Sequence, residues 1–278
     1  MTFDEFLKAA CPPLDLEWRK YRRRTSRHRV EARLRELGLD GFAGYLERLR
    51  SDPTEAAGLA DRMRVTVSRF FRERQLWEGL FQTVLPTLLR ERSPTDPLRL
   101  WSIGCCGGEE PYTLALLWRE RFAPRPVDIL ATDIDAASLE RTRAAVYAVS
   151  SLREVPAVLR QRYFRRQDHR WRLDAAIAGQ VHFAVHNLMT DPLPVGLDLI
   201  LCRYLAFTYY HGERRLLAAR RLWQALRPGG ALMIGRKEQL GPAGALFTPW
   251  PEASGIFRKQ PADAATLPLD LRPGRDTG

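Results

Sequence analysis

The chain has 278 residues, of which 45% are hydrophobic, and a formal net charge of +11. This length and apolar content suffice for one large domain with a buried core plus a small one, and they exclude a disordered chain. No run approaches the roughly 18 apolar residues of a membrane span, and residues 1–12 lack the basic-then-apolar order of a signal peptide. We therefore expect a soluble, cytosolic protein without membrane insertion.

Positive charge is concentrated near the start of the chain. Between Arg19 and Arg35 there are nine Lys or Arg residues and one acid, Glu31. Such a run is most often a solvated helix face, but it can also bind nucleic acid, a membrane surface or an acidic protein. Tyr21 is its only interleaved aromatic residue, and no nucleic-acid-binding signature is present. An acidic protein is therefore the favoured partner.

The chain up to about Leu89 has apolar residues at helical spacing, with Gly38 as a break between two helices. A linker helix is predicted to carry Ser68, the core residues Phe70 and Phe71, and Arg72. Arg72 is either a surface charge or a site residue whose planar guanidinium binds a carboxylate.

A strand, a small-residue turn and a helix follow one another from Leu98 to Trp118. The turn runs from Gly104 to Gly108, and Glu109 and Glu110 begin the helix. A turn without bulky side chains lets a ligand lie on backbone N–H groups, which is typical of a nucleotide-type pocket. The two acids are either ordinary helix-start residues or part of that pocket.

The next predicted strand, Val127–Thr132, ends at Asp133, the position from which an acidic side chain reaches a ribose diol. An adenosine-bearing cofactor is indicated. Glu109 and Glu110 would repel a pyrophosphate at the helix N-terminus, whereas the sulfonium and ammonium of S-adenosylmethionine suit them. The cysteines, including adjacent Cys105 and Cys106, show no metal-ligand spacing and are interpreted as small residues that fit a tight turn.

The remaining pattern alternates strands and helices. The predicted elements are a helix from Ala136 to Tyr147, an insertion from Ser150 to Gly179 with a basic hairpin at Arg165–Leu173, strands at Val181–Val185, Leu197–Leu201 and Ala231–Ile234, a helix at Glu213–Leu226, and a hairpin of Phe247–Trp250 with Gly255–Lys259. The insertion either accepts a peptide at a strand edge or carries its charges for solubility. The tail from Pro261 is predicted to be disordered.

This alternation predicts an α/β fold with a doubly wound parallel sheet and ligands at the C-terminal strand ends. Glu110, Asp133, Asn187 and Arg203 gather at those ends.

Several segments together resemble CheR-type chemotaxis receptor methyltransferases. GCCGGEEPYT is similar to their GCSTGEEPYS, VTVSRFFR to TNxTxFFR, LDLILCRYLAFTYY to FDxIFCRNVxIYF, and LRPGGALMIG to LxPGGxLxxG. The resemblance implies a Rossmann-like class I methyltransferase sheet in residues 76–260 with an inserted β-subdomain at 150–180, preceded by a helical domain and linker helix in residues 1–75 and followed by a tail, 261–278. It also implies methyl transfer from S-adenosylmethionine to a glutamate side chain of a chemoreceptor that the basic helix faces.

Carried over position by position, the resemblance places the cofactor contacts at Ser68, Arg72, Gly104, Glu110, Asp133, Asn187, Leu188 and Arg203. The chain departs from the pattern where the acceptor should lie: two family asparagines are replaced by Thr66 and Tyr204, and a tyrosine is replaced by Thr208, with Tyr209 beside it. Arg72, with Tyr204 or Tyr209, is expected to orient the acceptor. Two alternatives are a methyltransferase with another acceptor, such as a small-molecule carboxylate, and a non-catalytic adaptor that senses the cofactor.

Overall fold

A computed structural model describes residues 1–63 and 68–261. Clustering of the chain separates two compact units, one formed by Met1–Thr66 with Tyr204–Leu217 and the other by Val67–Arg203 with Ala218–Gly278. Among the described residues, no helix has both the length and the apolar character needed to cross a membrane.

The first unit is helical. Its helices are α1 (Phe3–Ala10), α2 (Arg24–Glu36), α3 (Gly41–Ser51), α4 (Pro53–Arg62) and α11 (Ala206–Tyr209), with the start of α12 (Gly212–Ala225) and two 3-10 turns at Pro12–Leu14 and Trp18–Tyr21. Gly38, with φ +63°, ends α2 as predicted. A buried carboxylate, Glu55, accepts hydrogen bonds from Arg33 at 2.8 and 3.1 Å and from Tyr45 at 2.6 Å. Three helices are thereby joined at one charged group.

The segment 204–217 belongs to this helical unit although in the chain it follows residues 197–201, a strand of the other unit. Leu16 forms an isolated antiparallel bridge with Tyr210, and the rings of Tyr21 and Tyr209 lie 5.2 Å apart. The N-terminal helices are therefore not a complete unit without this distant segment.

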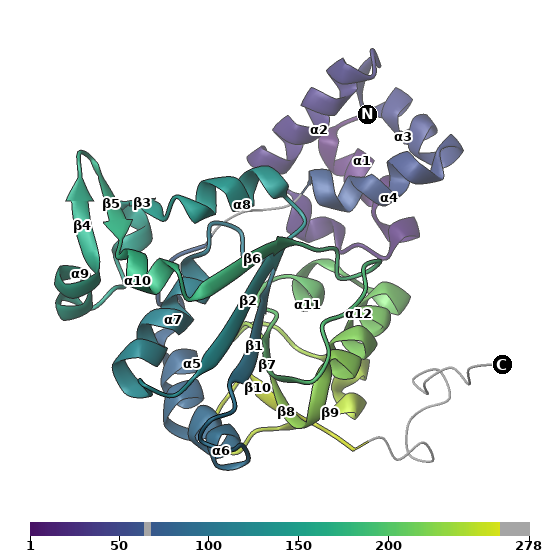
Figure 1. Cartoon of the computed structure of the whole chain (residues 1–278). Helices are drawn as coiled ribbons and strands as arrows, with labels where there is room; N and C mark the ends of the chain where they lie inside the picture. Colours follow the sequence, from purple (N-terminus) through teal and green to yellow (C-terminus); the bar gives the residue numbers. More distant parts are fainter. Residues whose placement is uncertain (64–67, 262–278) are drawn as a thin grey trace. The chain divides into compact units, whose positions relative to one another are not determined.

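The second unit is organised around a seven-stranded sheet (Figure 1). Its strands are β1 (Leu98–Ile103), β2 (Val127–Asp133), β6 (Val181–Val185), β7 (Leu197–Leu201), β8 (Leu226–Met233), β9 (Phe247–Pro249) and β10 (Ile256–Lys259), in the order β6-β2-β1-β7-β8-β10-β9. The five strands from β6 to β8 are parallel, and β10 runs antiparallel to both of its neighbours. The predicted strands and the terminal hairpin are confirmed, except that β8 begins at Leu226, which was predicted to end the preceding helix, and not at Ala231. The doubly wound sheet is mixed because that hairpin joins its edge.

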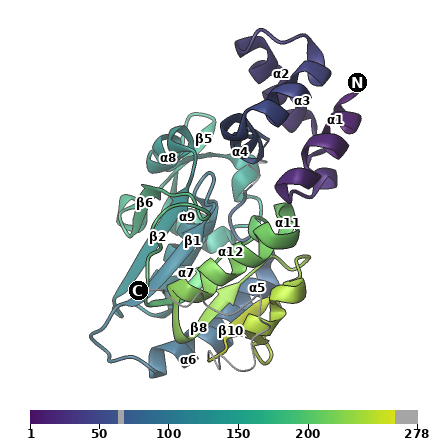
Figure 2. The ribbon, with the colours of Figure 1, turned by 90° about the vertical axis from the view of Figure 1, so that its right-hand side faces the viewer.

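Helices cover both faces of this sheet. Figures 1 and 2 show α5 (Arg74–Gly79), α6 (Leu85–Arg90) and α7 (Glu109–Arg121) on one face and α12 on the other. Alternate strand residues, such as Leu98 and Leu100 of β1, enter a buried core with α5, α6, α7 and the π-helical turn Leu80–Val84. Trp101 directly follows Leu100 in the strand, so its side chain points to the opposite face of the sheet, where it is fully buried.

A small three-stranded sheet is inserted after β2. It has the order β3-β5-β4, built from β3 (Val146–Ala148), β4 (Phe164–Gln167) and β5 (Arg170–Leu173), and it carries the helices α9 (Ala157–Tyr163) and α10 (Ala175–Ala178). The predicted basic hairpin is the β4–β5 pair. We call this sheet and these helices the inserted subdomain.

Two predicted helices differ from the structure. The segment from Ser68 to Arg72 is not helical, because Phe71 and Glu73 adopt φ of +57° and +63°, and helix α5 begins only at Arg74. The helix predicted over Ala136–Tyr147 ends as α8 (Ala136–Arg143), because Ala145 has φ +51° and the chain turns into β3. Thr66 and the tail beyond Pro261 lie outside the described residues.

Candidate functional site

Backbone hydrogen bonds, within the turn and to β2, hold the turn between β1 and α7 in place. Gly104 and Cys105 donate N–H bonds of 2.7 and 2.9 Å to the carbonyl of Thr132, and Gly108 donates one of 2.9 Å to Cys105. Gly108 has φ +80°, and a Cβ there would meet a side chain of α8 at 2.3 Å. Only glycine fits this position, because the turn packs directly against α8 there.

Asp133 ends β2 beside this turn. Its carboxylate oxygens accept the N–H groups of Cys106 at 2.9 Å and of Asp135 at 3.0 Å, and the residue is 3% exposed. Asp135 in turn caps α8 by accepting the N–H of Ser138. Asp133 therefore joins the turn after β1 to the loop after β2.

Glu110 and Arg203 form a buried ion pair at the ends of α7 and β7. Glu110 accepts from Ser102 at 2.8 Å and from Arg203 at 2.9 Å. The other nitrogen of Arg203 donates to Glu73 at 2.9 Å and to the carbonyl of Arg72 at 2.8 Å. Burial works against charge on Arg203, but the carboxylates of Glu110 and Glu73 outweigh it and raise the pKa of the guanidinium.

Glu73 is a site residue that the sequence reasoning missed. Its strained φ of +63° turns its carboxylate toward Arg203, and only its position directly after Arg72 could have drawn attention to it. The carbonyl of Arg72 also accepts the indole N–H of Trp77 at 3.1 Å, and Arg203 lies 5.6 Å from the centre of the Trp77 ring. The backbone at Arg72 is thus tied to the Glu110–Arg203 pair.

Glu109 differs from Glu110. It is 6% exposed and accepts a hydrogen bond from Ser151 at 3.2 Å. Burial raises the pKa of this carboxyl, and hydrogen bonds from Ser151 and Ser68 only partly offset that effect. The two predicted acids therefore differ in environment: Glu110 pairs with Arg203, whereas Glu109 is buried against the turn.

The loop after β6 holds two further predicted residues. Asn187 uses its side-chain oxygen to accept the N–H of Met189 at 2.9 Å, and its own N–H bonds to Asp191 at 2.9 Å. Leu188 is 4% exposed, and its carbonyl accepts from Arg221 of α12. The backbone of this loop is consequently well fixed.

The two predicted tyrosines lie in the helical unit, which is described separately. Tyr204 has φ +56°, and Tyr209 is 7% exposed and packs against Tyr21. The methyltransferase unit itself brings together Gly104, Glu110, Asp133, Arg203 and the backbone of Arg72.

Cysteines and metal ligands do not add to this site. Cys105 is buried in the turn, where burial raises the pKa of its thiol and keeps it protonated, and all four cysteines are free. Within residues 1–63 and 68–261, no cluster of His, Cys, Asp and Glu could hold a metal ion.

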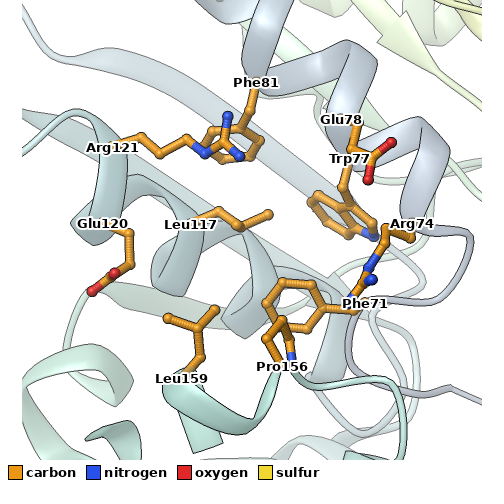
Figure 3. A pocket seen from close by; sticks show the side chains of 10 residues that line it. All are labelled: Phe71, Arg74, Trp77, Glu78, Phe81, Leu117, Glu120, Arg121, Pro156 and Leu159. Atoms are coloured by element: carbon orange, nitrogen blue, oxygen red, sulfur yellow. The ribbon is translucent and has the colours of Figure 1, made fainter.

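A separate cavity of about 310 Å³ opens beside α5 and α7 (Figure 3). Its apolar lining includes Phe71, Trp77, Phe81, Leu117 and Leu159, and charged residues of α5 and α7 stand around it. None of the predicted site residues lines this cavity. Two of its lining residues lie next to the Arg203 network, because Phe71 precedes Arg72 in the chain and the indole of Trp77 donates to the Arg72 carbonyl, which also accepts from Arg203.

Two family descriptions match the chain. Residues 14–63 match the all-alpha domain of CheR methyltransferases, and residues 66–253 match their SAM-binding domain. The chain belongs to the CheR methyltransferase family.

Relatives agree with this assignment to the CheR family. A chemotaxis protein methyltransferase of Listeria monocytogenes is 30% identical over 235 residues, covering 84% of this chain and 88% of that protein. Chemotaxis protein methyltransferase 2 of Pseudomonas aeruginosa is 32% identical over 219 residues, covering 76% of each. An uncharacterized 104.1 kDa protein of Rhodobacter capsulatus is 33% identical over 224 residues, but the chain spans only 23% of its length.

The CheR chain is therefore an S-adenosylmethionine-dependent methyltransferase with a class I fold, as its sequence predicted. The chemistry of the turn fits this cofactor. The carboxylates of Glu110 and Asp133 lie next to this turn, and acidic groups there suit a donor that carries a positive charge.

Proposed function

We propose that the chain transfers the methyl group to the carboxylate of a protein glutamate side chain, as in chemoreceptor methylation. The observation that carries this proposal is the double anchoring of the Arg72 carbonyl, at 2.8 Å from Arg203 and 3.1 Å from Trp77. The backbone of Arg72 is thereby fixed beside the Glu110–Arg203 pair, and we infer that its guanidinium, whose planar fork suits a carboxylate, extends from there to the acceptor. The names of the chemotaxis relatives support the same acceptor.

Each part of the methyl donor is proposed to contact a different residue of the site. When bound, S-adenosylmethionine supplies an electrophilic methyl carbon on a sulfonium. Asp133 accepts the ribose hydroxyls, because its carboxylate ends β2 beside the turn, the position from which an acidic side chain reaches a ribose diol. Glu110 attracts the ammonium of the methionine end, and Arg203 holds both Glu110 and the methionine carboxylate. Gly104, Ser68, Asn187 and Leu188 complete the cofactor contacts.

The acceptor side needs alignment more than acid–base catalysis. A glutamate carboxylate is ionised at neutral pH, so an oxygen lone pair attacks the methyl carbon while the carbon–sulfur electrons pass to sulfur. No proton moves, and the products are a methyl ester and S-adenosylhomocysteine. Arg72 clamps the acceptor carboxylate, and Tyr204 and Tyr209, which the sequence offers in place of the absent family tyrosine, belong to the helical unit.

The basic helix is proposed to face an acidic protein substrate. On α2 the side chains of Arg24, Arg27 and Arg29 are exposed. Some of this charge is already neutralised, since Arg27 pairs with Glu31 at 2.7 Å. A partner bound in this way would dissociate as the salt concentration rises.

The test is transfer of a labelled methyl group to receptor cytoplasmic fragments, followed by mild base. Label that is released by base, and that is absent from a fragment whose acceptor glutamates are changed to glutamine, supports the proposal. Base-stable label, or none with wild-type enzyme that binds S-adenosylhomocysteine, refutes it.

One observation favours a small-molecule carboxylate as the methyl acceptor. Thr208 and Tyr204 replace family residues where the acceptor should lie. Base-labile label on small carboxylic acids, with none on receptor fragments, would establish that alternative.

A further inference from the structure

The carbonyl groups of the glycine turn are bound by hydroxyl groups from outside the turn. The carbonyl of Cys106 accepts from Ser138 at 3.1 Å and from Thr142 at 3.0 Å, both on α8. The carbonyl of Gly107 accepts from the hydroxyl of Tyr147 at 2.8 Å. Because a peptide unit is planar, fixing each carbonyl also fixes the direction of the following N–H. The peptide after Cys106 is therefore held by Ser138 and Thr142, and the peptide after Gly107 is held by Tyr147 together with the bond from the Gly108 N–H to Cys105.

Tyr147 belongs to the inserted subdomain and not to the main sheet. It lies in β3, where it pairs with Trp171 of β5. Its ring packs edge-on against Phe70 at 4.8 Å and Tyr112 at 6.3 Å, and the residue is 6% exposed. Burial raises the pKa of its hydroxyl well above the ordinary value, so the group keeps its proton and donates it to Gly107.

A second contact from the same segment reaches the start of α7. Ser151, in the 3-10 turn Val149–Leu152 that follows β3, donates to Glu109 at 3.2 Å, and its carbonyl accepts the N–H of Phe70 at 3.2 Å. The Glu109 carboxylate folds back over Gly107, where an added Cβ would meet it at 2.6 Å. The segment from Tyr147 to Ser151 thus contacts the turn from two directions.

We propose that the inserted subdomain is part of the methyl-donor site, with Tyr147 as a positioning residue that sets cofactor affinity by holding the Gly107 carbonyl. This inference rests on the proposed location of the donor on the turn from Gly104 to Gly108. It follows that a partner that displaces β3 changes the affinity for S-adenosylmethionine without touching the cofactor.

The rival explanation is that Tyr147 only fills the core. The variant Tyr147→Phe separates the two, because it removes the hydroxyl and leaves the ring against Phe70 and Tyr112. Tyr163→Phe is the matched control: its hydroxyl, on α9 of the same subdomain, donates to Glu120 on the surface.

The experiment measures the Kd of S-adenosylhomocysteine by calorimetry on the full chain, with KM and kcat for the methyl donor. For Tyr147→Phe we expect the Kd and KM to rise about five- to tenfold at nearly constant kcat, which is the loss of roughly one buried hydrogen bond. Tyr163→Phe should bind like the wild type. A Kd for Tyr147→Phe within twofold of the wild type overturns the inference, as does a lower melting temperature with unchanged Kd.

Two further measurements keep the result interpretable. If Tyr147→Phe does not fold, Ser151→Ala takes its place, and it should weaken binding two- to threefold through the loss of the contact to Glu109; unchanged binding refutes the inference. If the wild type itself does not bind S-adenosylhomocysteine, the proposed donor site fails first, and the role of Tyr147 fails with it.

Discussion

The change Asp133→Asn tests the donor site directly. The Asp133 carboxylate accepts Cys106 N–H at 2.9 Å and Asp135 N–H at 3.0 Å, one on each oxygen. An asparagine keeps one acceptor oxygen, so one of the two amides would face an NH₂ group instead. A lost bond to a charged acceptor costs about 1.5–3 kcal/mol, and the unpaired buried N–H adds about 1 kcal/mol or more. If about 3 kcal/mol of this appears in binding, the Kd for S-adenosylhomocysteine rises roughly a hundredfold.

Calorimetry on the two purified proteins measures this Kd, and circular dichroism shows whether the variant is folded. Asp135→Asn is the matched control, because it removes the same charge two residues away and asparagine caps a helix as well as aspartate does. The control should bind within twofold of the wild type. A folded Asp133→Asn protein whose Kd changes less than threefold would refute the reasoning, and equal weakening in both variants would replace it with a long-range charge effect.

The remaining predictions concern the acceptor, the helical unit and the turn. Arg72→Ala should keep most of its affinity for S-adenosylhomocysteine and lose turnover in the labelled-methyl assay; unchanged turnover removes Arg72 from the site. Arg33 and its neighbours lower the pKa of Glu55 from 4.5 to about 2, so its ionised form stabilises the fold above pH 4.5, and this stabilisation is lost as the pH falls through 2. Glu55→Gln should therefore cost up to about 3 kcal/mol in denaturant unfolding at pH 7 and progressively less below pH 4.5; a gap that does not depend on pH contradicts the ion pair. Gly108→Ala should abolish S-adenosylhomocysteine binding because its Cβ overlaps α8 at 2.3 Å, whereas Gly44→Ala in α3, where a Cβ meets nothing closer than 4.0 Å, should bind normally; normal binding by the first variant would refute the steric argument.

Much of the methyltransferase fold could be predicted from local patterns. Apolar runs ending in polar residues located β1, β2 and β7, because the central strands of a parallel sheet are largely buried and mainly apolar. The edge position of the terminal hairpin was not predictable, since strand pairing depends on contacts between distant residues. The positive φ values of Phe71 and Glu73 were also hidden, because nothing in a side chain of these types favours that conformation.

The position of a residue could be predicted where its contacts lie in one neighbouring element. It could not be predicted where its partners come from three elements. Asp133 and the turn were located from their spacing alone. The partners of Arg203, namely Glu73, Glu110 and the Arg72 carbonyl, come from three separate segments. The different environments of adjacent Glu109 and Glu110 follow from the helix, which points neighbouring side chains in different directions.

The segment 204–217 limits how this protein can be taken apart. An excised fragment ending near residue 63 would lack the Tyr210 backbone that bridges Leu16 and the ring that packs on Tyr21. A chimera that takes these N-terminal helices from another member of the family would therefore have to take a second, internal stretch of about fourteen residues with them, so this helical unit is transferred as two separate pieces of gene.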